Sequence, residues 1–226
     1  MVFSSVGNIS INKLKQKLEK YFALLKTAST TSKRKPFIAH PGKIVKVKKD
    51  TFQTHCMIGK ACYGSNDSKR LAMILLNNLL GGPAMNTILN LRVREKYGFT
   101  YNIESNYSVY QDTGLFSIYL GTDPKYLDRC LKAIYKELAI LRSKTLSPNR
   151  LHLSKQQLKG QLAIGRESNS NVMLSQGKAL LVYNKVDSLS QIHERINGLD
   201  AEIMLEVANE QLNPSDFDAL FYLGKD

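Results

Sequence analysis

The stretch NLRVREKYGFTYNIES, residues 90–105, begins with the residue pattern of a helix and ends with that of a strand. Its first part continues a helix that we expect from residue 85 to residue 96. Gly98 ends this helix, because glycine accepts the backbone angles of a helix C-cap. Apolar and polar residues then alternate, which predicts a half-buried strand. The expected buried face carries Phe99, Tyr101, Ile103, Tyr107 and Val109.

The segments on either side predict the rest of the fold. Residues 111–114, QDTG, are turn formers, so the strand at 99–109 and the next one at 115–120 should form an antiparallel hairpin. Other strands are expected at 2–6, 43–47, 52–63 and 217–223. Other helices are expected at 11–25, 67–80, 123–143, 148–161, 171–184, 189–197 and 201–211. This order of strands, a block of helices and a return strand predicts an α+β fold, with helices packed on an antiparallel sheet.

Most of the positive charge lies at the beginning of the chain. The 226 residues include 32 Lys and Arg against 19 Asp and Glu, a net charge of +13. Residues 1–49 hold twelve of the basic residues and only one acid, Glu19, so the remaining chain is nearly neutral. A solvated helix face and a basic linker explain this distribution better than a nucleic-acid surface, and no zinc-finger or basic-aromatic RNA motif is found. We therefore expect no nucleic-acid partner.

No segment of the sequence is typical of a membrane-spanning or exported protein. The apolar stretch 71–80 is interrupted by two asparagines and is shorter than the roughly 20 residues that cross a bilayer. The first residues, MVFSSVGN, are unlike a signal peptide, so the chain is either not exported or lacks its natural beginning. A cytoplasmic location is the default expectation. We interpret the odd set of Cys56, Cys62 and Cys130 as small buried apolar residues.

The sequence contains no complete catalytic or metal site. The four histidines, His40, His55, His152 and His193, are too far apart to place two on one helix face, so neither H-E-x-x-H nor H-x-x-E-H is present. The glycines of LLGGPAMN, residues 79–86, match neither a phosphate loop nor a dinucleotide fingerprint and are typical of helix termination. We expect no metal site and no self-contained catalytic site in this chain.

Arg94 and Tyr101 lie seven residues apart across the change from helix to strand and allow two interpretations. In the structural one, Arg94 is a cation in the last helical turn, stabilised by the helix dipole by about 0.3–1 kcal/mol, and Tyr101 is an aromatic residue of the core. In the functional one, both side chains contact a substrate. Periodicity alone favours the structural interpretation.

The opening stretch, with LLNNLLGGPAMNTILN (75–90) before it and QDTGLFSIYLGTDP (111–124) after it, closely resembles the insulinase–pitrilysin family of zinc metallopeptidases, which includes the mitochondrial processing peptidase. SVGNISINKLKQKLEKYF (5–22) is similar to the end of the family's first repeat. LKGQLAIGRESNSNVMLSQGKALLVYNK (158–185) is similar to the helical region of its second repeat. Members of the family consist of two homologous α+β halves around a chamber. Their first half binds zinc through H-x-x-E-H and a later glutamate, a pattern that this chain lacks.

The resemblance implies a division of the chain. Residues 1–27 would be the terminal strand and helix of a preceding repeat, and residues 43–226 a second, peptidase-like repeat without a zinc site. Between them, ASTTSKRKPFIAHPG (28–42) has the prolines, hydroxyl side chains and basic cluster of a linker.

The resemblance also implies roles for individual residues. Arg94 and Tyr101 match the arginine and tyrosine with which the family's second half reaches the substrate backbone, and Arg92 is the competing arginine. Donors directed at the substrate carbonyl oxygen would stabilise the charge that develops there, and losing one such donor commonly costs on the order of 10²–10³ in rate. Gly98 would let the helix stop and the strand start within a few residues, so that both side chains converge on one point.

By this resemblance, the chain is predicted to be the substrate-binding, non-catalytic C-terminal half of a zinc-dependent metallopeptidase that hydrolyses peptides. Its partner would be a metal-bearing half, either upstream in the same polypeptide or in a separate subunit. Zinc is expected in that half, so this chain alone should hydrolyse nothing. The alternative is a catalytically silent scaffold or interaction subunit of the same fold.

Overall fold

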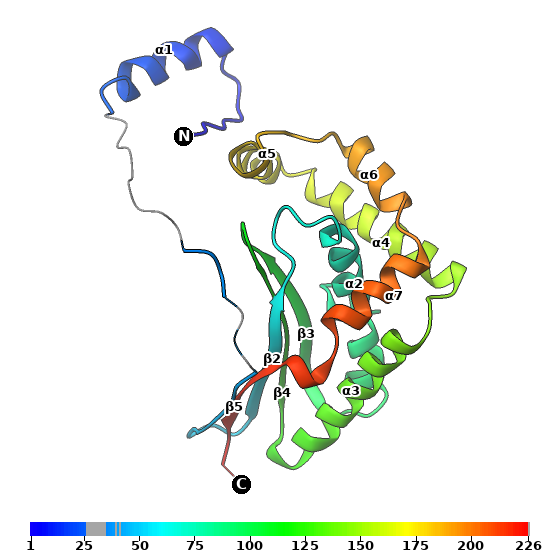
Figure 1. Ribbon diagram of the computed structural model, residues 1–226. Helices are drawn as coiled ribbons and strands as arrows, with labels where there is room; N and C mark the ends of the chain where they lie inside the picture. The colour runs from blue at the N-terminus through cyan, green and yellow to red at the C-terminus, as the bar shows by residue number, and fades with distance from the viewer. Residues whose placement is uncertain (26–34, 39, 41, 226) are drawn as a thin grey trace. The chain divides into compact units, whose positions relative to one another are not determined.

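The computed structural model describes residues 1–25, 35–38, 40 and 42–225, which belong to two compact units (Figure 1). The first unit consists of residues 1–36 and 164–186, and the second of residues 37–163 and 187–226. Residues 28–34, 39 and 41 of the expected linker lie outside the described residues. No helix in the described part of the chain is both long and apolar enough to cross a membrane.

The first unit contains the helices α1 (Ile11–Phe22) and α5 (Asn169–Tyr183). α1 begins after Ser10, whose hydroxyl accepts a hydrogen bond from the backbone N–H of Lys13 at 3.4 Å. The positions of both helices agree with the expected ones to within three residues. None of the residues of α1 is buried.

The strand expected at residues 2–6 is wrong, because these residues form a loop. The Ser4 hydroxyl of this loop donates a hydrogen bond of 2.7 Å to the backbone carbonyl of Met173 in α5. A strand needs a neighbouring strand to satisfy its backbone N–H and C=O groups, and the described residues of the first unit provide none.

The second unit is built on one five-stranded sheet. Its strands are β1 (Ile44–Lys48), β2 (Thr54–Cys62), β3 (Thr100–Val109), β4 (Gly114–Thr122) and β5 (Asp218–Leu223). They lie in the order β1-β5-β2-β4-β3. β1 runs parallel to β5, and the other neighbouring pairs are antiparallel. The expected α+β class is confirmed. The sheet differs from the expected one in its parallel pair, which is possible because β1 and β5 are joined through the rest of the unit and not by a hairpin.

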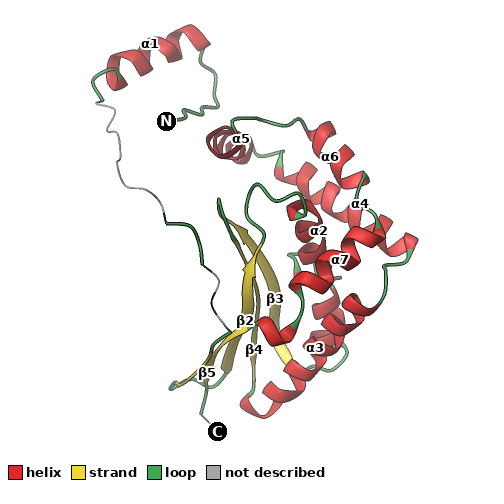
Figure 2. Ribbon diagram, viewed as in Figure 1, coloured by secondary structure: helices red, strands yellow, loops and turns green. Residues whose placement is uncertain are grey.

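Helices cover one face of this sheet (Figure 2). They are α2 (Arg70–Gly81), α3 (Leu127–Ser143), α4 (Pro148–Gly165), α6 (Leu189–Asn197) and α7 (Ala201–Gln211), with short 3₁₀ turns at Pro124–Tyr126 and Pro214–Asp216. The core lies between the helices and the sheet. Phe116, Ile118 and Leu120 of β4 point into it and are fully buried, as are Leu75 of α2 and Ile134 of α3.

The opposite face of the sheet carries no helix from the described residues of the second unit, and we call it the free face. Strand register and alternation define its residues: Val45 and Val47 of β1; Asp218, Leu220 and Tyr222 of β5; His55, Met57, Gly59 and Ala61 of β2; Leu115, Ser117, Tyr119 and Gly121 of β4; and Tyr101, Asn102, Glu104, Asn106 and Ser108 of β3. Met57 and Leu115 on this face are each 46% exposed.

Candidate functional site

Arg94 lies in a π-helical turn, Asn90–Glu95, in which backbone hydrogen bonds span five residues instead of four. The clearest of these bonds runs from the Lys96 N–H to the Leu91 carbonyl at 3.2 Å. Single π-helical turns inside other helical structure are rare and frequently occur at functional sites. The backbone conformation therefore makes the segment that carries Arg94 a candidate functional site.

The helix expected at residues 85–96 starts later than expected, and residues 90–95 of it are π-helical. Residues 82–87 form turns, and the helix begins at Ile88 before it widens. The residue pattern does not distinguish the two kinds of helix, because Leu89 and Val93 reach the core in the observed structure as they would in an α-helix. Core packing, which the sequence does not display, decides the backbone hydrogen-bond pattern here.

The Arg94 side chain is half-buried, and its Nη1 donates a weak hydrogen bond to the Sδ of Met85 at 3.8 Å. A thioether sulfur is a weak acceptor, so most of the five guanidinium donors stay available. Arg92, two residues earlier, is exposed. Of the two arginines, Arg94 is therefore the one whose side chain is held against the fold.

Gly98 ends the helical segment with a backbone φ of +62°, in the left-handed region that favours glycine. Its N–H donates a hydrogen bond of 2.9 Å to the Arg94 carbonyl, which closes the last turn. The expectation that the helix ends at Gly98 is confirmed. The chain can then enter β3 two residues later.

Three aromatic rings support this turn. Tyr97 and Phe99, on either side of Gly98, stack with ring centroids 5.2 Å apart and an angle of 7° between the planes. Tyr126, at the beginning of α3, continues the stack at 5.3 Å from Phe99. The Arg129 guanidinium lies 6.0 Å from both the Phe99 and the Tyr126 rings. The stack fixes the connection between the helical segment and β3 to the rest of the unit.

Tyr101 lies at a β-bulge at the beginning of β3. Thr100 pairs with Thr122 of β4, but the next residue of β4, Gly121, pairs with Asn102 and not with Tyr101. The extra residue reverses the alternation, so Thr100 is buried beneath the helices whereas Tyr101 points out of the free face and is 70% exposed. The expectation that Tyr101 belongs to the buried face is wrong for this reason.

The bulge is stabilised by the Thr100 hydroxyl, which lies 2.6 Å from the Gly121 carbonyl and 2.8 Å from the Asn102 carbonyl. Within the described part of the chain, the Tyr101 hydroxyl has no hydrogen-bond partner. Arg94 and Tyr101 thus both retain hydrogen-bond donors for a ligand, one on each side of the Gly98 turn.

A second pair of polar side chains on the free face was not predicted from the sequence. The Nδ1 of His55 lies 2.8 Å from the Tyr119 hydroxyl. Tyr119 also lines a shallow cavity of about 200 Å³ together with Met57 and Glu104. His55 and Tyr119 come together only through the register of β2 and β4, so no local sequence pattern reveals the pair.

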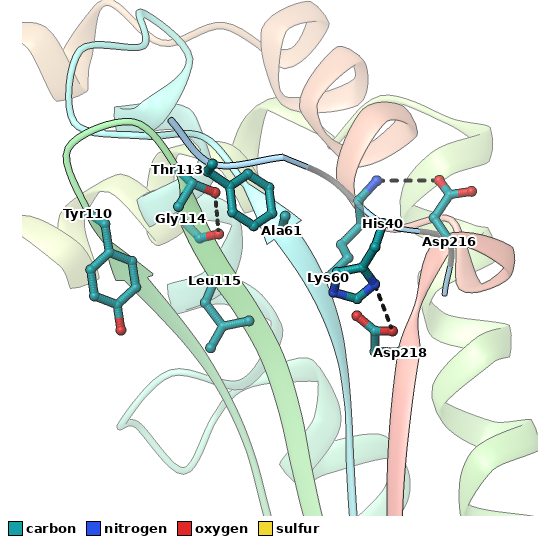
Figure 3. A pocket seen from close by; sticks show the side chains of 10 residues that line it. His40, Lys60, Ala61, Tyr110, Thr113, Gly114, Leu115, Asp216 and Asp218 are labelled. Carbon is teal, nitrogen blue, oxygen red and sulfur yellow. Dashed lines mark hydrogen bonds and ion pairs between the residues drawn. The ribbon is translucent and has the colours of Figure 1, made fainter. Parts of the chain in front are cut away.

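A larger cavity of about 520 Å³ lies where the β3–β4 hairpin turns (Figure 3). Ala61 and Leu115 of the free face line it together with Tyr110 and Phe37. We call it the hairpin cavity. Neither Arg94 nor Tyr101 lines the hairpin cavity or the shallow one.

One side of the hairpin cavity is charged. The Lys60 ammonium donates a hydrogen bond of 3.3 Å to the Asp216 carboxylate, and the His40 Nδ1 lies 3.9 Å from the Asp218 carboxylate (Figure 3). The Asp218 carboxylate also accepts a hydrogen bond of 2.6 Å from the backbone N–H of Lys43. The cavity therefore joins apolar walls to a group of carboxylates.

Comparison with known proteins identifies the family. The sequence matches the family described as "Peptidase M16 inactive domain" over residues 1–158. The chain belongs to this family. An uncharacterized zinc protease of Bacillus subtilis is 33% identical to this M16 domain over 215 residues, which are 91% of this chain and 52% of that protein. One from Streptomyces coelicolor is 28% identical over 219 residues, 94% of this chain and 48% of that protein. The chain thus spans about half the length of these relatives.

Solved structures share the fold of this M16 domain. A peptidase M16 inactive domain from Pseudomonas fluorescens has a TM-score of 0.85 and 23% identity, covering 98% of this chain and 53% of that one. A protease from Helicobacter pylori has a TM-score of 0.83 and 21% identity, covering 98% and 54%. The resemblance to zinc metallopeptidases seen in the sequence is confirmed by the family match.

The described residues of this M16 domain do not fit a zinc ion. In the described residues, no three His, Cys, Asp or Glu side chains gather where they could hold a metal. The histidines lie on separate elements: His40 before β1, His55 on β2, His152 on α4 and His193 on α6. Protein zinc sites take three or four such ligands at about 2.0–2.3 Å. We therefore assign no metal chemistry to the described residues.

The cysteines behave as the sequence predicts. Cys56 and Cys130 are fully buried, and Cys62 is partly buried. Burial raises the pKa of the Cys56 thiol to about 12. A thiol with such a pKa stays protonated near neutral pH and is a poor nucleophile, so these residues serve as small core side chains.

Proposed function

We propose that this chain is the substrate-binding, non-catalytic half of a zinc-dependent metallopeptidase and acts on peptides together with a metal-bearing half. That half lies either upstream in the same polypeptide or in a separate subunit, and it would hold the zinc. The lengths of the relatives named zinc proteases, about twice that of this chain, support a two-part enzyme. The observation that carries the proposal is the bulge in β3, which exposes Tyr101 beside the turn that holds Arg94.

The same proposal divides the chain into the end of a preceding repeat (1–27), a linker (28–42) and a second repeat (43–226). α1 supports this division, because its apolar residues recur at helical spacing but remain exposed: Ile11 is 64% exposed and Phe22 39%. An amphipathic surface helix normally packs its apolar side on a core. The preceding repeat would supply that core.

In this function, Arg94 and Tyr101 hold the backbone of the peptide near the reacting bond. The carbonyl oxygen at that bond gains negative charge during hydrolysis. A guanidinium N–H and a phenol O–H that are already in place stabilise such charge without reorganisation, and this is usually the largest single contribution to catalysis. Gly98 and the ring stack would keep the two donors in a fixed relation.

Kinetics of single variants test this role. In the assembled enzyme, Arg94→Ala and Tyr101→Phe should each lower kcat for a fluorogenic peptide by about 10²–10³. Arg92→Ala is the matched control, because it removes the same charge two residues away and should leave turnover nearly unchanged. Equal turnover of all three variants and the wild-type enzyme would contradict the proposal and favour a silent scaffold.

The cysteines bear on the compartment in which the enzyme acts. Cys56, Cys62 and Cys130 are all free thiols. Structural disulfides are rare in reducing compartments, where thiols persist. We therefore propose the cytoplasm as the site of action.

A further inference from the structure

We infer that the hairpin cavity is a distal subsite that binds an apolar residue of the substrate and a neighbouring basic residue. The inference rests on the proposed function, because it takes Tyr101 as the place where the same peptide is held near the reacting bond. It also makes the substrate class more specific. The chain should select extended peptides that are long enough to reach both places.

Tyr101 and the two cavities follow one another along β3 and β4. Tyr101 stands at the beginning of β3, and the shallow cavity lies near its middle, where Glu104 pairs with Tyr119. The hairpin cavity begins at Leu115 and continues to Tyr110, just after the end of β3. These residues lie on or beside the free face, so an extended peptide can follow the two strands without meeting a helix of the second unit.

The spacing along β3 sets the length of peptide that this arrangement requires. Tyr110 lies nine positions after Tyr101 in the sequence. At about 3.4 Å per residue, this corresponds to roughly 30 Å. An extended peptide has nearly the same rise, so about nine residues of substrate would span the distance. A substantially shorter peptide could occupy only one of the two places.

The hairpin cavity has the size and walls of a side-chain site. Its volume of about 520 Å³ falls in the range of roughly 300–1,000 Å³ that is typical of ligand pockets. Phe37 is 43% exposed, Leu115 46% and Tyr110 54%, so a bound apolar residue would bury surface on all of them. The Phe37 backbone N–H donates a hydrogen bond of 2.9 Å to the Asp112 carboxylate, which ties this wall to the hairpin turn.

The charge of the free face differs from that of the whole chain. The chain has a net charge of +13, yet the only charged residues that the five strands place on the free face are Glu104 and Asp218. Lys60 lies at the hairpin cavity, but its ammonium is paired with Asp216. The Lys60–Asp216 pair has no net charge, and among the described side chains the Asp218 carboxylate has only the His40 ring beside it, at 3.9 Å. Asp218 therefore makes the cavity attractive to a cation, which explains the basic residue in the expected ligand.

Peptide binding to the full chain tests the subsite. Fluorescein-labelled peptides of about 8 and about 20 residues, each with one Phe-Arg pair, would be titrated and followed by fluorescence anisotropy. The longer peptide should bind at least about tenfold more tightly, and Leu115→Ser should remove this advantage. Leu153→Ser, which changes a residue of α4 that is 57% exposed, is the matched control and should keep it. Unchanged affinity of Leu115→Ser for the longer peptide would overturn the inference.

An Asp218 variant, combined with two peptides that differ in one positive charge, tests whether the subsite binds a basic residue. Asp218→Asn keeps an oxygen that can accept the Lys43 N–H, so the fold should persist. This variant should weaken binding of the longer peptide about tenfold when the peptide carries Phe-Arg, and hardly at all when it carries Phe-Gln. If Asp218→Asn weakened the binding of both peptides equally, the subsite would not recognise a basic residue.

Failure of the subsite and failure of the proposed function have different signatures in the assembled enzyme. Leu115→Ser should raise KM for long peptides only, whereas Arg94→Ala should lower kcat for short and long peptides alike. A subsite effect with unchanged kcat in Arg94→Ala would retain the cavity as a peptide site and reject the catalytic role of the arginine. The reverse result would reject the subsite alone.

Discussion

On the helix-covered face of the sheet, Phe116, Ile118 and Leu120 of β4 are fully buried, whereas their neighbours Leu115 and Tyr119 on the free face remain in contact with solvent. Both sets belong to the same strand, in which successive side chains point to opposite faces of the sheet. Apolar surface that is removed from water stabilises the fold by roughly 25 cal/mol per Å². The free face contributes less of this energy, so its residues can serve binding without loss of the fold.

The largest expected difference between the faces is in stability. Phe116→Ala should lower the free energy of unfolding by about 3–5 kcal/mol, because it leaves a cavity in a fully buried site. Ser117 follows Phe116 in the sequence and lies on the free face, so Ser117→Ala should change the free energy of unfolding by less than about 0.5 kcal/mol. Urea denaturation of the two variants measures both values. Similar losses would show that the free face is packed as tightly as the covered one.

Glycines extend the comparison to backbone conformation. Gly98→Ala should destabilise the chain by about 1–2 kcal/mol, because an alanine is strained at a φ of +62°. Gly160→Ala should instead stabilise it by about 0.5–1 kcal/mol, because Gly160 lies inside α4 and an added Cβ meets no atom within 4 Å. Thermal or urea unfolding should therefore give shifts of opposite sign. A neutral Gly98→Ala would mean that the turn is not held in the left-handed conformation.

Local sequence signals predict much of the covered layer. α6 and α7 begin and end at the predicted residues. Their beginnings are fixed by Ser188 and Asp200, whose side chains accept hydrogen bonds from the backbone N–H groups of Gln191 and Ile203. The β3–β4 hairpin follows from its turn residues and from the alternation of apolar and polar residues on either side of them. In these segments the local preference and the tertiary structure agree.

The candidate site is where pattern reasoning fails. Alternation places Tyr101 in the core, but one extra residue in the ladder turns it outward. The π-helical turn at Arg94 has the same apolar spacing as an α-helix. Both features depend on contacts that form only in the folded sheet, such as the hydrogen bond between Thr100 and the Gly121 carbonyl. The residues themselves were suggested by family resemblance, and their role stays a prediction.

Two tyrosines on β3 give a matched test with a smaller effect. The Tyr107 hydroxyl donates a hydrogen bond of 2.6 Å to the Tyr63 carbonyl, on the covered side of the strand. Tyr107→Phe should therefore cost about 1 kcal/mol of unfolding free energy. Tyr101→Phe removes a hydroxyl without a described partner and should change stability by less than about 0.5 kcal/mol. A large stability loss in Tyr101→Phe would give this residue a structural role and weaken the kinetic test.

The smallest expected effect is a pH dependence on the covered side. The Lys69 ammonium and, to a lesser extent, the Tyr63 hydroxyl stabilise the Glu210 carboxylate of α7, which lowers its pKa below the ordinary value. A carboxylate whose pKa is lowered by folding stabilises the fold above the unfolded pKa of about 4.3. This contribution is lost as the pH falls through the folded value. Because the Glu210 side chain is 42% exposed, it should amount to only a few tenths of a kcal/mol.

Urea unfolding at about pH 7 and about pH 3 measures this contribution. Wild-type protein should lose slightly more stability on acidification than Glu210→Gln, because only the wild-type carboxylate takes up a proton at this site. Glu206→Gln is the control, since Glu206 also pairs with Lys69 but is not bonded to Tyr63. It should retain most of the wild-type response. Identical pH responses of wild type and Glu210→Gln would mean that the ion pair holds α7 in position without contributing to its stability.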